Sequence, residues 1–300
     1  MNEVETRSGF VALLGATNAG KSTLVNQLVG TKVSIVSHKV QTTRALIRGI
    51  ITEGKTQMVL VDTPGIFTPR RRLDRAMVST AWAGAKDADI VLFIVDAERG
   101  FSGDAGAILD SLKESTRRNI LVLNKVDRVE PPKLLDMAAY AAQTANLEKT
   151  FMISALNGSG CKDLVKYLSG ALPHGPWYYP EDQISDLPMR NLAAEITREK
   201  LYERLHQELP YHSHVETEKW EEMKNGDVRI QQVIYVERES QKKIVLGHQG
   251  GTIKAIGQSS RMELAGILEQ KVHLFLFVKV RENWGDDPER FREMGLDFSS

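Results

Sequence analysis

One eight-residue stretch near the N-terminus restricts the fold of this chain more than any other feature. Residues 15–22 have the sequence Gly-Ala-Thr-Asn-Ala-Gly-Lys-Ser and satisfy every fixed position of the pattern G-x-x-x-x-G-K-[ST]. The apolar run 10–14 before it predicts a buried strand, and residues 23–29 after it carry apolar side chains at helical spacing. A strand, a glycine-rich turn and a helix N-terminus in this order form a concavity of backbone N–H groups that suits phosphate oxygens. The stretch therefore predicts a phosphate-binding loop.

Two side chains of this loop have the chemistry to hold a nucleotide and its metal ion. Lys21 can reach the β- and γ-phosphates, and the Ser22 hydroxyl is a ligand for Mg²⁺. The alternative is a strand-to-helix turn that ends in Lys-Ser by coincidence, and the flanking strand and helix argue against it. We predict nucleotide contacts along the whole loop, from Gly15, Ala16, Thr17, Asn18, Ala19, Gly20, Lys21, Ser22 and Thr23.

The length of 300 residues favours about two domains. The formal net charge is zero, so the charge of the whole chain does not indicate a nucleic-acid partner.

Cys161 is the only cysteine, which excludes an internal disulfide framework and fits a reducing compartment. The N-terminus is polar, and no apolar run approaches the roughly 20 residues that span a bilayer. We expect a cytoplasmic protein whose membrane contacts, if any, are peripheral.

Strands and helices alternate from the N-terminus to about residue 172, which predicts an α/β domain over residues 1–172. Its sheet should be mostly parallel, with helices on both faces. Glu53-Gly54 supplies a tight turn between the second and third strands, so we expect that pair to be antiparallel. The candidate strands are 9–14, 45–51, 56–62, 90–96, 119–123 and 149–153.

Three more motifs follow strands of this domain. Asp62-Thr63-Pro64-Gly65 places a carboxylate at the end of a buried strand, where a Mg²⁺ site belongs, and the Gly65 N–H can face a γ-phosphate. In Asn124-Lys125-Val126-Asp127, Asp127 can accept two parallel hydrogen bonds from guanine, whereas adenine offers no such pair of donors. Lys125 can lie along the base, and Asn124 can tie its loop to the phosphate loop. The predicted nucleotide contacts thus also include Asp62, Thr63, Pro64, Gly65, Ile66, Asn124, Lys125, Val126, Asp127, Ser154 and Ala155, the last pair facing the guanine carbonyl.

In this order and spacing the four motifs resemble those of translation-factor-class GTPases. The resemblance implies that the polar connector 33–44 is the first switch, in which one Thr closes over Mg²⁺ and the γ-phosphate. We favour Thr43 for this role, with Thr42 as the alternative and exposed loop threonines as a third interpretation. The expected Mg²⁺ ligands are Ser22, Thr43 and Asp62, and the expected catalytic residues are Lys21, Thr43 and Gly65.

Ile66 stands where many GTPases carry the Gln that orients the attacking water. A hydrocarbon side chain cannot do this, so we expect slow intrinsic hydrolysis that depends on a partner, a backbone-held water or a monovalent cation. Asn18 occupies the position from which some GTPases that lack this Gln coordinate K⁺. K⁺ is therefore an open hypothesis.

The second half of the chain predicts a different module. Residues 173–188 concentrate Pro and Gly and are typical of a linker. Residues 189–285 predict the order helix, strand, strand, helix, G-x-x-G loop, helix, strand, with the first helix over 191–209. This order resembles an α+β KH domain of the bacterial topology (type II). Gly247 and Gly250 lack a Cβ, so a sugar-phosphate backbone can approach the main chain. The acidic tail 286–300 predicts a terminal helix.

Positive charge is local in this second domain. Residues 240–262 carry four basic residues and no acidic one, so RNA affinity should come from the loop rather than from bulk attraction. The middle loop residues are uncharged, which predicts a weaker phosphate contact than in KH loops with Lys or Arg there. The predicted RNA contacts are Lys242, Lys243, Gly247, His248, Gln249, Gly250, Lys254 and Arg261.

A GTPase domain with Gln41-Thr42-Thr43-Arg44 and Ile66, joined to a KH domain that ends in the sequence 280–284, resembles the bacterial Era family over nearly the whole chain. That resemblance implies GTP, GDP and Mg²⁺ as ligands, binding near the 3′ end of small-subunit (16S) rRNA, and a role in rRNA processing and 30S assembly. It also implies a monomer and a peripheral contact with the inner membrane. Two alternatives stay open here: a GTPase whose KH-like domain binds protein or membrane, and a P-loop ATPase or kinase.

Overall fold

The computed structural model describes residues 5–39, 41–206, 208–282, 284 and 287–298. The chain divides into two compact units. The first comprises the described residues of 1–34, 43–186 and 294–300, and the second comprises those of 35–42 and 187–293. Residues 285 and 286, at the predicted start of the tail, lie outside the described residues.

The first unit is built on a six-stranded sheet in the order β2-β3-β1-β4-β5-β6. Neighbouring strands are parallel except β2 and β3, which form the expected antiparallel hairpin. All predicted strands of this unit are confirmed, and β2 begins and ends two residues later than expected. The strands are β1 (Arg7–Leu14), β2 (Ile47–Glu53), β3 (Thr56–Asp62), β4 (Ile90–Asp96), β5 (Arg118–Asn124) and β6 (Lys149–Ile153).

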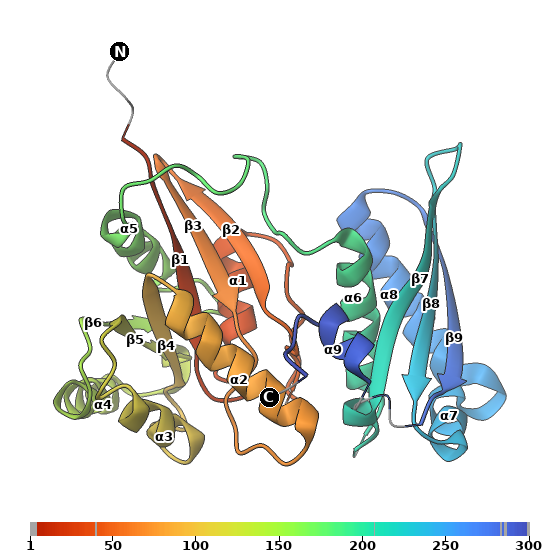
Figure 1. The fold of residues 1–300 in the computed structure, drawn as a ribbon, viewed down its shortest axis with the longest axis horizontal. Helices are drawn as coiled ribbons and strands as arrows, with labels where there is room; N and C mark the ends of the chain where they lie inside the picture. The colour runs from red at the N-terminus through yellow and green to blue at the C-terminus, as the bar shows by residue number, and fades with distance from the viewer. Residues whose placement is uncertain (1–4, 40, 207, 283, 285–286, 299–300) are drawn as a thin grey trace. The chain divides into compact units, whose positions relative to one another are not determined.

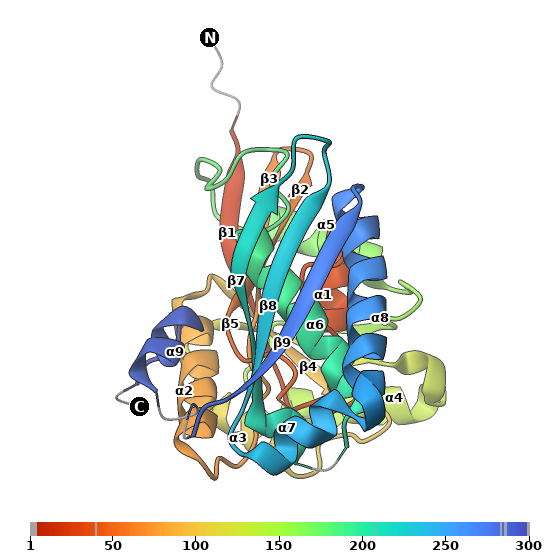
Figure 2. The ribbon, with the colours of Figure 1, turned by 90° about the vertical axis from the view of Figure 1, so that its right-hand side faces the viewer.

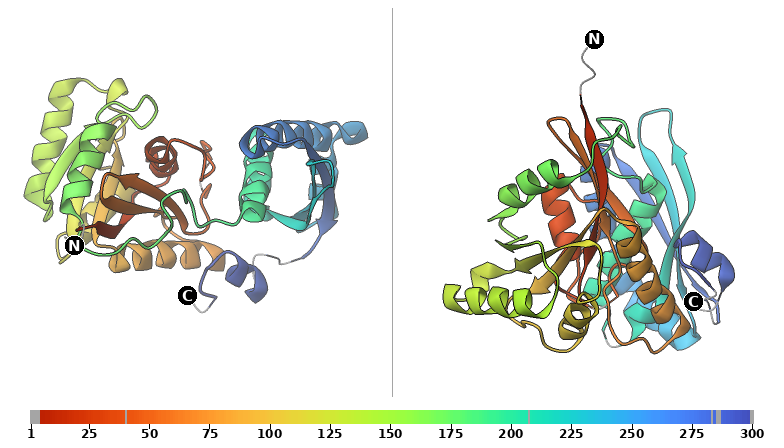
Figure 3. Two further views of the ribbon diagram at one scale, coloured as in Figure 1. Left: turned by 90° about the horizontal axis from the view of Figure 1, so that it is seen from above. Right: turned by 60° about the vertical axis from the view of Figure 1, so that its left-hand side comes forward.

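Helices cover both faces of this sheet, as Figures 1 and 3 show. Side chains alternate along a strand, so Leu13 packs in one core with Leu24 and Leu164, whereas Leu14 packs in the other with Leu134. The helices are α1 (Lys21–Val29) and α5 (Cys161–Ala171) over the first core, and α2 (Arg72–Asp87), α3 (Asp104–Ser111) and α4 (Pro131–Thr144) over the second. In such a sheet the carboxyl ends of the parallel strands are where ligands bind.

The predicted linker is fixed along the first unit over much of its length. Gln57 Oε1 accepts the N–H groups of Tyr178 and Tyr179 at 2.9 and 3.0 Å. The N–H of Ile50 donates to the carbonyl of Ile184 at 2.9 Å, so the segment covers the exposed edge of β2. The tyrosines that the linker carries therefore belong to the first unit, with Tyr178 packed on Phe10 at 4.9 Å between ring centroids.

The second unit has a three-stranded sheet in the order β7-β8-β9, with β7 antiparallel and β9 parallel to β8. Figure 2 views this unit from the strands, with α6 and α8 behind them. The predicted order of elements is confirmed, but the first helix ends at Arg204 and not at 209, and the tail helix covers only 288–293. The elements are α6 (Met189–Arg204), β7 (Ser213–Glu222), β8 (Val228–Val236), α7 (Glu239–Leu246), α8 (Gly251–Leu268), β9 (Val272–Val280) and α9 (Pro288–Glu293).

Candidate functional site

The predicted phosphate loop lies between β1 and α1, and its backbone depends on glycine. Gly20, directly before α1, has φ 98° and Asn18 has φ 63°, both in the left-handed region. A Cβ at Gly20 would lie 2.2 Å from Nδ2 of Asn124, and a Cβ at Gly15 would lie 2.4 Å from the carbonyl oxygen of Ile94. The first N–H groups of α1 have no partner within the helix, so the loop and the helix start can receive an anion.

Lys21 is folded back onto its own loop. Its Nζ donates to the carbonyls of Gly15 at 2.9 Å and Ala16 at 3.0 Å, and only 6% of the residue is exposed. Burial lowers the pKa of the Lys21 ammonium to about 8, against a smaller opposing effect of the Asp62 carboxylate. A phosphate oxygen would supply the counter-charge that this buried ammonium is missing.

Three hydroxyl groups converge on one buried carboxylate at the end of β3. Asp62 Oδ2 accepts from Ser22 at 2.6 Å and from Ser34 at 2.8 Å, and Thr43 Oγ1 lies 3.5 Å from the same oxygen. Thr43 Oγ1 is also 2.9 Å from Ser22 Oγ. The Thr42 hydroxyl instead donates to the carbonyl of Lys39 at 2.7 Å. The structure thus brings Thr43, the favoured threonine, to Ser22 and Asp62.

Asp62 is a buried carboxylate with one oxygen available to bind a cation. It is fully buried, and its Oδ1 has no hydrogen-bond partner among the described residues. Burial is the main cause that raises the pKa of Asp62, and its hydroxyl partners only partly oppose it. One carboxylate oxygen with adjacent hydroxyls fits Mg²⁺, which is usually held by one or two carboxylates together with phosphates and water.

The segment after Asp62 lies against the phosphate loop. The Ile66 N–H donates to the carbonyl of Gly15 at 3.1 Å, and a Cβ at Gly65 would lie 2.8 Å from Cγ2 of Thr17. Thr63 Oγ1 donates to the carbonyl of Leu13 at 2.6 Å. The Ile66 side chain is 8% exposed and belongs to the apolar core beneath β1, so this position contributes packing.

Asn124 joins three of the predicted loops. Its Nδ2 donates to the carbonyl of Ala19 at 2.9 Å, and its Oδ1 accepts the N–H groups of Lys125 at 2.8 Å and Ala155 at 2.9 Å. The prediction that Asn124 ties its loop to the phosphate loop is confirmed by these distances. Asp127 is exposed in the short turn Val126–Arg128, where its carboxylate is open to a ligand.

Sequence reasoning missed Asp96 and Ser34. Asp96, the last residue of β4, holds Lys125 through an Nζ–Oδ2 contact of 2.5 Å, while Lys125 Nζ also donates to the carbonyl of Asn18 at 3.0 Å. The available signal was a carboxylate at the carboxyl end of a buried strand, as for Asp62. Ser34 had no signal, because only the fold brings its hydroxyl to Asp62.

The predicted G-x-x-G loop lies between α7 and α8. Gly247 has φ 72° and ψ 176°, a combination that only glycine adopts readily, and a Cβ there would lie 2.2 Å from Oγ1 of Thr252. Gly250 has φ 76° and is followed directly by α8. His248 and Gln249 at the loop tip are exposed. The structure places the other predicted RNA contacts on the two flanking helices, with Lys243, Lys254 and Arg261 exposed and Lys242 half-buried.

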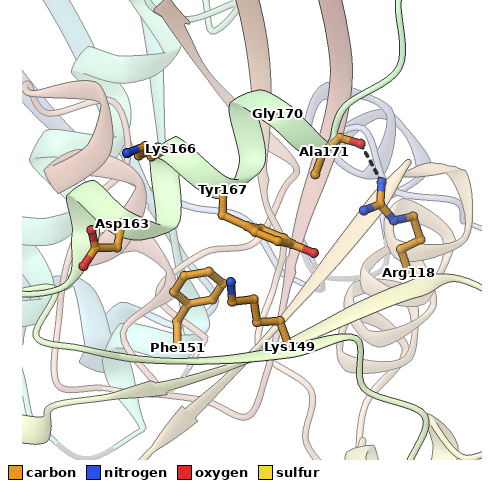
Figure 4. Close-up of a pocket in the computed structure, with 8 residues that line it drawn as sticks. All are labelled: Arg118, Lys149, Phe151, Asp163, Lys166, Tyr167, Gly170 and Ala171. Atoms are coloured by element: carbon orange, nitrogen blue, oxygen red, sulfur yellow. Dashed lines mark hydrogen bonds between the residues drawn. The ribbon is translucent and has the colours of Figure 1, made fainter.

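A separate cavity of about 680 Å³ lies at the amino ends of β5 and β6, away from the predicted nucleotide contacts (Figure 4). Arg118 donates to both carboxylate oxygens of Glu148 at 2.8 and 2.7 Å, and the Tyr167 hydroxyl also donates to Glu148. The Arg118 bonds, followed by the Tyr167 bond, lower the pKa of Glu148 to about 2. This network stabilises the wall of the cavity.

The lowered pKa of Glu148 predicts a pH-dependent contribution to stability. A depressed carboxylate pKa stabilises the fold above the unfolded value near 4.5, and the contribution is lost as the pH falls toward about 2. For this half-exposed pair we expect Glu148→Gln to lower the melting temperature by about 1–3 °C at pH 7 and by less at pH 3.5. The exposed Glu114→Gln is the control. A Glu148→Gln effect of equal size at both pH values would contradict the prediction.

Among the described residues, no helix has both the length and the apolar character that crossing a bilayer requires.

Comparisons with known proteins agree with the two folds. A family model described as a 50S ribosome-binding GTPase matches residues 10–125, and a KH domain model matches residues 208–285. The GTPase Era of Brucella suis biovar 1 is 74% identical over 98% of this chain and 94% of its own length. The GTPase Era of Rhizobium meliloti is 72% identical, with the same two coverages.

Two solved structures are similar over nearly the whole chain. One is Era in complex with MgGDPNP and nucleotides 1506–1542 of 16S ribosomal RNA, with a TM-score of 0.91, 37% identity, and 97% of this chain and 99% of that chain covered. The other is an Aquifex aeolicus Era variant bound to GDP·AlF₄⁻, with a TM-score of 0.91, 36% identity and the same coverage. By sequence identity, family models and fold, the chain belongs to the Era family of GTPases, with a P-loop GTPase domain followed by a C-terminal KH domain.

Proposed function

We propose that this chain is a GTP-hydrolysing switch that binds small-subunit rRNA near its 3′ end through the KH domain, and that it acts in rRNA processing and 30S assembly. The observation that carries the nucleotide part is the position of Asn124, whose side chain joins the phosphate loop, the N-K-x-D loop and Ala155. Asn124 therefore holds the predicted phosphate-binding and base-binding loops next to each other. The similar Era structure with MgGDPNP and 16S rRNA supports the RNA part.

The proposed contacts follow from the geometry. Backbone N–H groups of residues 15–23 and the Lys21 ammonium receive the phosphates, and Gly65 faces the γ-phosphate. Asp127 recognises guanine, with Lys125 along the base. Ser154 and Ala155 hold the loop beside it, since their N–H groups donate to the Ser159 carbonyl at 3.0 Å and to Asn124 Oδ1 at 2.9 Å. Ser22, Thr43 and Asp62 are the residues that would hold Mg²⁺, which neutralises charge on the phosphates when bound.

Asp62→Asn tests the proposed metal site. The variant removes the buried charge that has a free oxygen, so we expect the affinity for Mg²⁺ in the GTP complex to fall roughly 10- to 100-fold. The measurement is the GTP dissociation constant across a Mg²⁺ titration. In EDTA the variant should bind GDP no more weakly than the wild type. If Mg²⁺ tightens GTP binding equally in both proteins, Asp62 does not serve the metal.

Hydrolysis without a glutamine needs another way to hold the attacking water. We infer that K⁺ takes part, because Asn18 occupies the loop position from which some GTPases that lack this Gln coordinate K⁺. The expected result is faster GTP hydrolysis in KCl than in NaCl at equal ionic strength, and a smaller difference in Asn18→Ala. Equal rates in the two salts would remove K⁺ from the mechanism.

The proposed RNA contacts are the loop 247–250 and the basic side chains beside it, Lys242, Lys243, Lys254 and Arg261. Binding of an RNA with the 3′-terminal 16S sequence, measured with a non-hydrolysable GTP analogue and with GDP, tests the function as a whole. The switch proposal expects tighter binding with the analogue. Equal binding in both states would reduce the protein to a constitutive RNA binder, and absence of binding would favour a protein or membrane partner for the KH domain.

We also propose domain boundaries at residues 172, 188 and 285, a monomeric state and a cytoplasmic location, with peripheral contact to the inner membrane. The agreement of the unit boundary at residues 186 and 187 with the end of the linker supports the second boundary. Co-sedimentation of the purified chain with vesicles of anionic lipid tests the membrane contact, and light scattering tests the monomer.

A further inference from the structure

The Lys125 side chain is fixed at both of its ends within the first unit. Its backbone has φ 65°, a left-handed conformation that residues other than glycine adopt rarely, and its N–H donates to Asn124 Oδ1 at 2.8 Å. At the other end, Nζ donates to the carbonyl of Asn18 at 3.0 Å and to Asp96 Oδ2 at 2.5 Å. The methylene groups between these two ends therefore follow one defined course.

Asp96 is a fixed point of the sheet. It is the last residue of β4 and pairs in register with Asn124, the last residue of β5. The N–H of Ala97, directly after it, donates to the carbonyl of Asn124 at 2.9 Å. Only 8% of the Asp96 side chain is exposed. Because side chains on strands are held more precisely than those on loops, the carboxylate can anchor a lysine that comes from a loop.

The local turn does not explain why residue 96 carries a charge. Asp96 Oδ1 accepts the N–H of Glu98 at 3.0 Å, a bond that asparagine makes equally well. A buried carboxylate loses hydration, and asparagine would avoid most of that cost. Arg99 Nε lies 3.8 Å from Asp96 Oδ2 with its side chain 67% exposed, so this pair contributes little. The contact with Lys125 is what a carboxylate supplies here and an amide does not.

The ion pair restricts where the Lys125 stem can lie. A lysine side chain is flexible and strongly hydrated, so without the carboxylate it would adopt many more rotamers. A bound nucleotide would then have to order it, which costs affinity. We propose that Asp96 is a positioning residue for guanine-nucleotide binding, which preorganises the Lys125 stem as one wall of the base site. This inference rests on the proposed GTPase function.

Nucleotide affinities of the full-length Asp96→Asn variant test the proposal. The variant keeps an acceptor for the Glu98 N–H and replaces Oδ2 by a donor, which cannot bind an ammonium. GTP and GDP share the base, so we expect the affinities for GDPNP and GDP to fall by the same factor, roughly tenfold. Asp110→Asn is the matched control, since Asp110 also binds a lysine, Lys113, at 2.7 Å. Its two affinities should equal those of the wild type.

Inosine diphosphate separates this role from a general distortion of the site. It has the purine ring of GDP without the exocyclic amine that Asp127 is proposed to bind. A change in the Lys125 stem acts on the face of the ring, so Asp96→Asn should weaken both diphosphates equally and leave their affinity ratio at the wild-type value. A displaced Asp127 would instead reduce the preference for GDP over inosine diphosphate, and that result would overturn the proposal.

Lys125→Met tests the pair from the other side, because it keeps an unbranched stem and removes the ammonium. Its GDP affinity should fall by a similar factor, and adding Asp96→Asn should cause no further loss. Asp96→Glu retains the charge and should bind GDP more tightly than Asp96→Asn does.

Lys125→Met leaves Asp96 in place, so it keeps the proposal falsifiable if Asp96→Asn does not fold. Wild-type GDP affinity in either single variant, or a further loss in the double variant, would overturn the role of Asp96. Failure of the wild type to prefer GTP over ATP would instead overturn the proposed function.

Discussion

Asp127→Asn is expected to lower the affinity for GTP roughly 10²- to 10⁴-fold, because one hydrogen bond becomes a contact between two donors and the other loses its charged acceptor, at about 1.5–3 kcal/mol each. The physical reason is the match of two acceptor oxygens with the N1–H and exocyclic amine of guanine. An amide offers one acceptor and one donor, so one of the two bonds becomes a contact between donors. Competition of GTP and ATP for the purified protein, measured with a fluorescent guanine nucleotide, gives both affinities.

The same substitution supplies its own control for folding. Xanthine carries a carbonyl where guanine has the amine, and an asparagine side chain can pair with that carbonyl and with N1–H. We therefore expect Asp127→Asn to bind xanthosine triphosphate better than GTP. Asp136→Asn, an exposed carboxylate on α4, removes the same charge without this effect. A variant at Asp127 that still prefers GTP would refute the assignment of guanine recognition to this residue.

The sequence predicted the parts of the site in which a motif with reactive or ligand-binding side chains directly follows a buried strand. The phosphate loop, Asp62 and the N-K-x-D loop each follow a buried strand, and the carboxyl ends of parallel strands meet at one edge of a sheet. Asp96 follows the same rule, and its pairing in register with Asn124 brings its carboxylate to Lys125. It was missed because no motif marks it.

The end of the helix α6 could not be predicted, because it depends on contacts between residues that are far apart in the sequence. Apolar spacing extended the helix of the second domain to 209, whereas α6 ends at Arg204, and Lys39 binds the carbonyls of Tyr202 and Leu205 at its end. Lys39 is more than 160 residues away from both Tyr202 and Leu205 in the sequence.

Gly247→Ala is expected to weaken RNA binding roughly 10- to 100-fold through the loss of one or two charge-assisted contacts to phosphate. Gly247 has φ 72° and ψ 176°, and side chains in this region cost about 1–3 kcal/mol. An added Cβ would also lie 2.2 Å from Oγ1 and 2.8 Å from the backbone nitrogen of Thr252. The loop has to change its conformation, and the N–H groups at the start of α8 move with it.

Gly251→Ala is the matched control, since it adds the same methyl group four residues along the chain. Gly251 has φ −61° and ψ −42°, and an added Cβ there would have no heavy atom within 4 Å in the described structure. We expect this variant to bind the 16S 3′ oligonucleotide like the wild type, with guanine-nucleotide affinity unchanged in both variants. Fluorescence anisotropy with a saturating GTP analogue measures the difference. If the two alanine variants bind RNA equally, the backbone of Gly247 does not set the phosphate contact, and the basic side chains of α7 and α8 have to carry the affinity instead.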